Sequence, residues 1–275
     1  MNAAQASPKL AVIRTTLSAW GTVPRNIGLA FRLYWPWFAI FAASLLAWAV
    51  GIGVNSGFST PSPALVGGAG WVPIVVMFVA MLLATPAIFV GWHRGIHTGE
   101  RPRQPIRVDG AVWGYIGYSI LIGLAVLLVM GLILLLVTVV AGISTGLGDG
   151  PMSIERLVAL RPFLPLVIIP YYLLLSRFSL VLPAVAVGQS MSISDSFRRT
   201  RGNTWRLTIG AGLVYLPVVV LSGVAEIVGV AFPGALALIL GVSLLLALTW
   251  VFCLHAALSF GTLALQQLAP AEAAA

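Results

Sequence analysis

Six long apolar segments divide the chain, and this pattern constrains the fold more than any other feature. They cover residues 34–54, 71–92, 113–141, 163–188, 207–231 and 235–264. Each is long enough to approach or exceed the roughly 20 residues that a helix needs to cross a bilayer. Their apolar residues form uninterrupted runs rather than an alternating pattern, which favours helices over a β-barrel. The sequence therefore predicts an all-α polytopic membrane protein with six transmembrane helices.

The composition agrees with a chain whose surface faces lipid. Hydrophobic residues make up 60% of it and charged residues only 8%, whereas soluble domains carry about 25% charged residues. The net charge of +8 is explained by membrane orientation and anionic lipid, so we expect no nucleic-acid partner. The single cysteine, Cys253, excludes a disulfide within the chain.

The basic residues predict the orientation of the chain in the membrane. Twelve of them fall before the first span, between spans two and three, and between spans four and five. The intervening loops hold only Arg156 and Arg161. By the positive-inside rule, both termini are predicted to be cytoplasmic. The preference for Arg over Lys suggests a GC-rich bacterial genome, hence a multi-pass protein of a bacterial inner membrane.

Three regions are predicted along the chain. Residues 1–33 form a cytoplasmic amphipathic segment, residues 34–264 a six-helix membrane domain, and residues 265–275 a disordered cytoplasmic tail. Within the first region, residues 9–23 place the side chains of Leu10, Ile13, Leu17 and Trp20 on one helical face. This spacing predicts an interfacial helix.

A second basic segment, residues 192–201, resembles the first. It places Ile193 and Phe197 on one helical face and arginines on the other. Asn26 and Asn203 follow the two segments, and each is predicted to cap the next membrane helix. The pattern is consistent with three tandem hairpin units, each a basic segment followed by two spans. The alternative is that any basic cytoplasmic segment beside a membrane looks amphipathic.

Several residues are candidates for binding a ligand or lipid. Arg177 lies inside span four, where a charge is costly and usually faces a bundle interior, a cavity or the interface. Either it snorkels to phosphate groups or it lines a cytoplasm-facing cavity. His255 lies at a comparable depth on span six, either facing Arg177 or a polar pocket, or packed as a neutral side chain. Four further candidates are Arg198, Arg199, Arg201 and Arg206, and anionic headgroups are their expected partners.

The sequence predicts no catalytic residues, cofactor or metal. The common hydrolase, phosphate-loop and zinc-protease motifs are absent. His93 and His97 are four residues apart with Glu100 close by. Glycines at 95 and 99 argue against a regular helix there, and a metal site needs converging ligands. We therefore expect a protein that is not an enzyme.

Three motifs carry a resemblance to a family. They are Gly91-Trp92-His93-Arg94 with Gly99-Glu100, the run from Arg177 to Ala184, and the run from Ser194 to Arg206. Together they resemble six-span bacterial inner-membrane proteins related to the membrane domain found beside some glycerophosphoryl diester phosphodiesterases. The catalytic domain of those enzymes has no counterpart in this chain. The resemblance implies a role concerned with lipid or the cell envelope, without enzymatic activity.

Two functions are therefore expected from the sequence. The first is a non-enzymatic, lipid-interacting or envelope-related membrane protein. The second is a transporter or permease for a lipid or small solute, with a cytoplasm-facing cavity around Arg177. Gly110 and Gly114, four residues apart, permit close helix packing within the chain, with a second copy, or with another membrane protein.

Overall fold

The computed structural model describes residues 8–56, 71–101, 106–145, 164–232 and 234–268, and within them every regular element is an α-helix. This confirms the predicted all-α class. The helices are α1 (Val12–Arg25), α2 (Ile27–Ser56), α3 (Trp71–His97), α4 (Gly110–Thr145), α6 (Leu164–Phe178), α7 (Val181–Ala186), α8 (Ile193–Arg199), α9 (Thr204–Val214), α10 (Leu216–Ala231) and α11 (Leu236–Leu268).

Five segments of the described chain are long and apolar enough to cross a membrane as single spans, and the pair α9 and α10 makes a sixth if counted together. The two helices of that pair are bent by 43° at their junction. Pro217 lies at the start of α10 and has no amide hydrogen with which to continue the α9 hydrogen-bond ladder. The chain is thus a multi-pass membrane protein by the length and composition of its helices.

The span that contains α6 and α7 is interrupted at residues 179–180. Pro183 lies inside α7 and cannot donate a hydrogen bond to the carbonyl of Ser179, four residues earlier. The helix is therefore broken about one turn before this proline.

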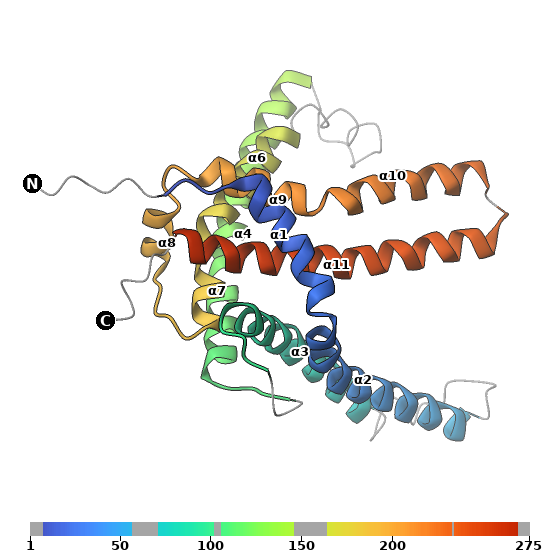
Figure 1. The fold of residues 1–275 in the computed structure, drawn as a ribbon. Helices are drawn as coiled ribbons and strands as arrows, with labels where there is room; N and C mark the ends of the chain where they lie inside the picture. The colour runs from blue at the N-terminus through green and yellow to red at the C-terminus, as the bar shows by residue number, and fades with distance from the viewer. Residues whose placement is uncertain (1–7, 57–70, 102–105, 146–163, 233, 269–275) are drawn as a thin grey trace, which may run out of the picture.

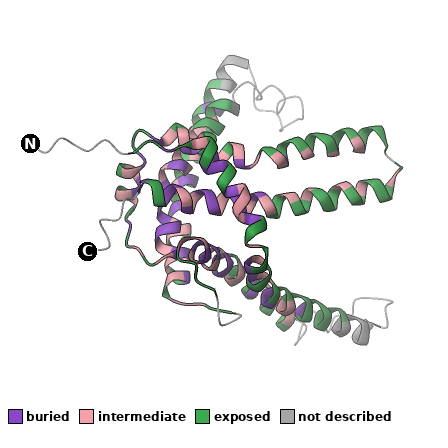
Figure 2. Ribbon diagram, viewed as in Figure 1, coloured by how far each residue is buried: buried purple, intermediate pink, exposed green. Residues whose placement is uncertain are grey.

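Three helical hairpins extend from one common region in different directions (Figure 1). They pair α2 with α3, α4 with α6, and α10 with α11. We call the common region the junction; it comprises α1, α7, α8, α9 and the adjoining ends of α3, α4, α6 and α11. Helix α1 lies across α9 and α11. The buried residues concentrate at the junction, whereas the arms of the hairpins are mostly exposed (Figure 2).

The exposed surface of the arms is apolar. Leu127 on α4 is 72% exposed and Val230 on α10 is 79% exposed. An exposed apolar surface of this extent is unfavourable in water but is the expected surface of a helix in lipid.

Two glycines allow α2 and α3 to approach closely near the junction. A Cβ atom on Gly91 would clash with the side chain of Leu33, and one on Gly95 would clash with Leu29. Gly95 and Gly99 were predicted to prevent a regular helix around His93 and His97. Helix α3 nevertheless continues through Gly95 and ends at His97. That prediction was wrong, since the helical backbone at Gly95 is stabilised by packing.

Helix α1 is amphipathic, but the face that packs against the rest of the protein is not the one that carries Ile13 and Leu17. Its buried residues are Thr15, Thr16, Ala19 and Val23. Ile13 is 70% exposed and Leu17 is 57% exposed. The small side chains face α9 and α11 because they permit close packing of the crossing helices. The larger apolar side chains of Ile13 and Leu17 are exposed, as is Arg14 on the same helix.

Two predicted region boundaries differ from the structure. Helix α2 begins at Ile27 rather than near residue 34. Helix α11 continues to Leu268, with Leu265 and Leu268 buried. Residues 265–268, which were predicted to belong to a disordered tail, are therefore helical. Packing of the last turn of α11 extends the helix beyond the apolar run. The remainder of that predicted tail, residues 269–275, lies outside the described residues.

Candidate functional site

A cavity of about 250 Å³ lies in the junction, where α6, α9 and α11 diverge. Residues of α3, α4, α6, α7, α9 and α11 line it, so each hairpin contributes. Its lining is mainly apolar and includes Leu182, Pro183 and Phe260. Polar groups come from seven side chains, those of His93, Tyr115, Tyr172, Ser176, Ser179, Thr208 and Tyr215. A concave apolar site with a few polar groups is typical of small-ligand binding sites.

The ring of His93 is held by α11. His93 is 1% exposed, and its Nδ1 atom lies 2.7 Å from Oγ1 of Thr262. The Thr262 hydroxyl donates its hydrogen to the Leu258 carbonyl at 3.0 Å. When the hydroxyl donates there, it accepts from His93; in that arrangement Nδ1 carries the hydrogen of the neutral ring and Nε2 is an acceptor.

Tyr115 on α4 lies beside His93. The ring centroids are 6.1 Å apart, and Tyr115 is 5% exposed. Of the hydrogen bonds between these two side chains and the described residues, the structure shows the one from His93 Nδ1 to Thr262. Nε2 of His93 and the Tyr115 hydroxyl are therefore available to a ligand, as are the hydroxyls of Tyr172 and Tyr215 in the same lining.

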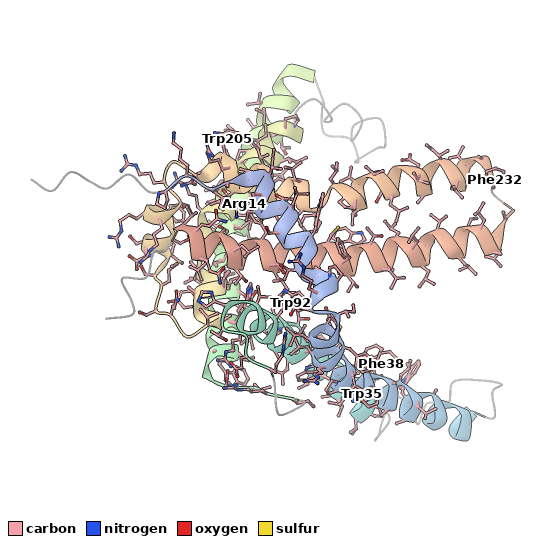
Figure 3. All side chains as sticks on the ribbon, in the orientation of Figure 1. Arg14, Trp35, Phe38, Trp92, Trp205 and Phe232 are labelled. Atoms are coloured by element: carbon pink, nitrogen blue, oxygen red, sulfur yellow. The ribbon has the colours of Figure 1, made fainter. Side chains whose placement is uncertain are left out.

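His255 is packed among aromatic rings next to this cavity. Its ring centroid lies 4.6 Å from that of Trp92 and 5.3 Å from that of Tyr34. Nδ1 lies 2.8 Å from the Val251 carbonyl, while Nε2 is buried without a partner. Trp92, at the centre of the junction in Figure 3, donates from Nε1 to the Ser259 hydroxyl at 3.0 Å. His255 is not among the described residues that line the cavity.

Arg177 connects α6 to α8. Its Nη1 atom donates a hydrogen bond of 2.9 Å to the carbonyl of Phe197, and its guanidinium carbon lies 5.7 Å from the centroid of the Phe197 ring. The hydroxyl of Ser196 donates to the Arg177 carbonyl at 2.6 Å. The structure does not bring Arg177 and His255 together, and Arg177 does not line the junction cavity among the described residues.

Helix α8 confirms the predicted amphipathic segment. Ile193 and Phe197 pack against a cluster that includes Phe178 and Val181. Ser192 and Asp195 form a reciprocal capping box at its start. Hydrogen bonds from the Ser192 side chain and backbone lower the pKa of Asp195. Desolvation opposes them, and the charges of Arg198 and Arg199 add to the lowering.

The four candidate arginines near α8 have different surroundings. Arg198 pairs with Asp195, whereas Arg199 and Arg201 form no ion pair with a described residue. Arg206 donates from Nη1 to the Leu10 carbonyl at 2.9 Å. Thus Arg206 partly serves to hold the N-terminal segment, while Arg199 and Arg201 remain available.

Neither asparagine uses its side chain to cap the following helix as predicted. Asn203 occupies the N-cap position of α9 without a side-chain cap bond. It instead accepts from the Leu10 amide and donates to the Pro8 carbonyl. The Asn26 side chain donates to the Thr22 carbonyl and accepts from Arg101. Tertiary partners compete successfully with the local cap.

Arg94 and Asp109 form an ion pair that joins the end of α3 to the start of α4. Arg94 Nη1 lies 2.7 Å from Asp109 Oδ2, and Arg94 Nε donates to the Ala186 carbonyl at 2.8 Å. Asp109 also accepts from the Ala111 and Val112 amides at the start of α4. Burial opposes ionisation of Asp109, but Arg94, the Val112 amide and Arg107 together lower its pKa.

The metal-like spacing of His93 and His97 has another explanation. His93 contacts Thr262, and Nδ1 of His97 lies 3.2 Å from Nε2 of Gln266. His93 and His97 are four residues apart on α3, and their partners Thr262 and Gln266 are four apart on α11. The two contacts therefore lie along one line between the helices. Among the described residues, no three His, Cys, Asp or Glu side chains gather in a way that could hold a metal ion.

Sequence reasoning did not identify the residues that line the cavity. His93 was considered as a metal ligand and as part of a family-like motif but not as part of a cavity, and Tyr115 was not considered. The sequence shows only that both are residues with a polar group in largely apolar segments, which does not place them together. Comparison with protein-family models, with curated proteins and with solved structures finds no match to this chain.

Proposed function

We propose that the protein is a non-enzymatic, lipid-interacting protein of a bacterial inner membrane whose basic face binds anionic headgroups, with both termini cytoplasmic. The observation that supports this most is the unbalanced charge at the junction. The carboxylates Glu100, Asp109 and Asp195 pair with Arg94, Arg107 and Arg198. The other basic residues described there form no ion pair: Lys9, Arg14, Arg25, Arg32, Arg101, Arg177, Arg199, Arg201 and Arg206.

The position of this charge favours a membrane surface as the partner. Side-chain nitrogens concentrate at the junction end of the molecule, while Phe232 marks the apolar tip of the α10/α11 hairpin (Figure 3). On α1, the exposed Ile13 and Leu17 lie beside the exposed Arg14. An apolar strip next to basic residues is typical of helices that lie at the headgroups. Each basic residue near an anionic surface contributes about 1 kcal/mol of attraction.

Retention of lipid by the purified protein tests this proposal. The full chain is incubated in detergent with equal amounts of phosphatidylglycerol and phosphatidylcholine, and bound lipid is counted by native mass spectrometry. Wild type is expected to retain phosphatidylglycerol preferentially. The double variant Arg199→Gln and Arg201→Gln should lose much of this preference, since both arginines lack a carboxylate partner.

Arg198→Gln provides the matched control, because Arg198 is already paired with Asp195. It removes one positive charge from the same short segment but should reduce the preference less than Arg199→Gln alone. Equal retention of the two lipids by wild type, or a preference unchanged in the double variant, would refute binding at this surface.

A second candidate function is transport of a lipid or small solute, and the junction cavity is the observation that favours it. Because Arg177 is absent from the described lining, this version of the proposal no longer depends on that residue. It predicts that proteoliposomes move a fluorescent phospholipid between leaflets faster than protein-free vesicles. Equal rates in both preparations would leave only the lipid-binding function. The resemblance to membrane domains found beside glycerophosphoryl diester phosphodiesterases supports either lipid-related proposal.

A further inference from the structure

The few polar groups in the lining of the junction cavity restrict which membrane components it can bind. Its described lining contains no Arg, Lys, Asp or Glu side chain. A charged headgroup would lose its hydration there without gaining an opposite charge, which costs several kcal/mol. A purely apolar occupant would leave Nε2 of His93 and the Tyr115 hydroxyl unpaired in an apolar environment. The lining therefore fits an uncharged ligand with at least one polar group.

The hydrogen-bonding state of His93 defines that polar group further. With the Thr262 hydroxyl donating to the Leu258 carbonyl, Nδ1 donates to Thr262 and Nε2 accepts. The Tyr115 hydroxyl, on a ring whose centroid is 6.1 Å away, can donate or accept. An ester or ether oxygen could accept from Tyr115 but could not satisfy His93. A hydroxyl group can donate to His93 and accept from Tyr115 at the same time.

We propose that the junction cavity binds the hydroxyl end of an uncharged lipid alcohol. A volume of about 250 Å³ is slightly below the usual range of small-molecule pockets, so it holds the head of the ligand and the first part of its chain. Tyr172, which is 44% exposed, belongs to the lining. The cavity thus reaches the lipid-facing surface beside α6 and α9, where the rest of the chain continues into the bilayer.

The location of the cavity is consistent with a ligand that enters from one leaflet. Its α9 residues, Leu207 to Ala211, lie within the first eight residues of a helix that starts at Thr204. At 1.5 Å per residue, they are about 5–11 Å from the basic end of the helix. The hydroxyl hydrogens of Ser176 and Ser179 are donated to backbone carbonyls, so these two groups can only accept from a ligand.

Photolabelling of the full chain in nanodiscs tests the proposal. The probes are a long-chain fatty alcohol with a diazirine near its hydroxyl end and the methyl ether of the same molecule. The alcohol is expected to label peptides of α6, α9 or α11 that line the cavity. It should do so roughly fivefold more efficiently than the ether, the discrimination expected from about one hydrogen bond.

Three variants test where the label binds. Ala211→Phe places a ring in the cavity and should abolish labelling of these peptides, whereas Ala237→Phe makes the same change at an exposed position of α11 and should not. His93→Phe keeps a ring but removes the acceptor, and should equalise labelling by alcohol and ether. Thermal unfolding and size-exclusion profiles identify any variant that fails to fold. If His93→Phe is unstable, Ala211→Phe still tests the site, because it leaves every polar lining group in place.

The outcomes are distinct from those of the headgroup experiment. Labelling that spreads evenly over the hydrophobic arms, is equal for alcohol and ether, or persists in Ala211→Phe would overturn the proposal. Competition of the label by unlabelled diacylglycerol identifies a two-chain lipid as the source, and competition by unlabelled fatty alcohol alone identifies a single-chain one. The charges at Arg199 and Arg201 are not part of this site, so either proposal can fail while the other stands.

Discussion

The backbone amide of Leu10 donates a 2.9 Å hydrogen bond to Oδ1 of Asn203, although the residues are 193 positions apart. Nδ2 of Asn203 returns a bond of 3.0 Å to the Pro8 carbonyl. Leu10 is 0% exposed and Asn203 1% exposed. Asn203 thus binds the segment before α1 to the start of α9 in a peptide-like pairing.

Asn203→Ala should destabilise the protein by about 1–3 kcal/mol, because it leaves the buried Leu10 amide without a partner and removes the partly buried bond to the Pro8 carbonyl. The residues before α1 should also become more susceptible to protease. Thermal unfolding in detergent and limited proteolysis of the full chain measure the two effects. Asn26→Ala is the control: the bonds of Asn26 join less buried groups, so it should lower stability less. Equal protease resistance of wild type and Asn203→Ala would contradict the clamp.

The role of Asn203 illustrates how far the sequence could be interpreted. Local sequence placed Asn203 correctly at the start of a membrane helix, as hydropathy placed the spans. It could not identify Pro8 and Leu10 as the partners, because the contact depends on how α1 crosses α9. The cavity was unpredictable for the same reason. His93 and Tyr115 come from different hairpins, and no local period relates them.

Asp109→Asn should reveal a pH-dependent contribution to stability. The folded state lowers the pKa of Asp109, so ionised Asp109 stabilises the fold above the unfolded value near 3.9. This contribution is lost as pH falls through the lower folded pKa. At neutral pH the substitution should cost about 1–2 kcal/mol, since the pair with Arg94 is partly buried. Below about pH 4 the difference should shrink.

Unfolding of wild type and Asp109→Asn from pH 2 to 7 measures this dependence. Asp195→Asn is a suitable comparison, because the pKa of Asp195 is also lowered but its partner Arg198 is 76% exposed. Its effect should follow the same direction with a smaller amplitude, as solvent screens exposed pairs. A constant difference between wild type and Asp109→Asn across this range would show that ionised Asp109 is not stabilising.

Arg177→Gln should loosen α8 without emptying the cavity. The substitution removes the bond to the Phe197 carbonyl and the contact with the Phe197 ring. Amide hydrogen exchange in residues 193–199 should therefore accelerate, whereas labelling of the cavity by the alcohol probe should stay the same. Arg14→Gln, at an exposed position of α1, controls for loss of one charge. Loss of cavity labelling in Arg177→Gln alone would instead indicate that Arg177 acts at the site.

Gly210→Ala links packing to the cavity. A Cβ atom at this position would clash with the ring of Phe260, which is 4% exposed and belongs to the cavity lining. Overpacking of this kind costs typically 1–3 kcal/mol; we expect a value near 1, because the ring can shift into the adjacent cavity. That shift should also reduce labelling by the alcohol probe. Gly212→Ala, on the same helix with nothing within 4 Å, should gain about 0.5–1 kcal/mol from helix propensity and leave labelling unchanged. Thermal unfolding of the two variants gives opposite signs if α9 and α11 pack as described, and equal signs would contradict the contact between Gly210 and Phe260.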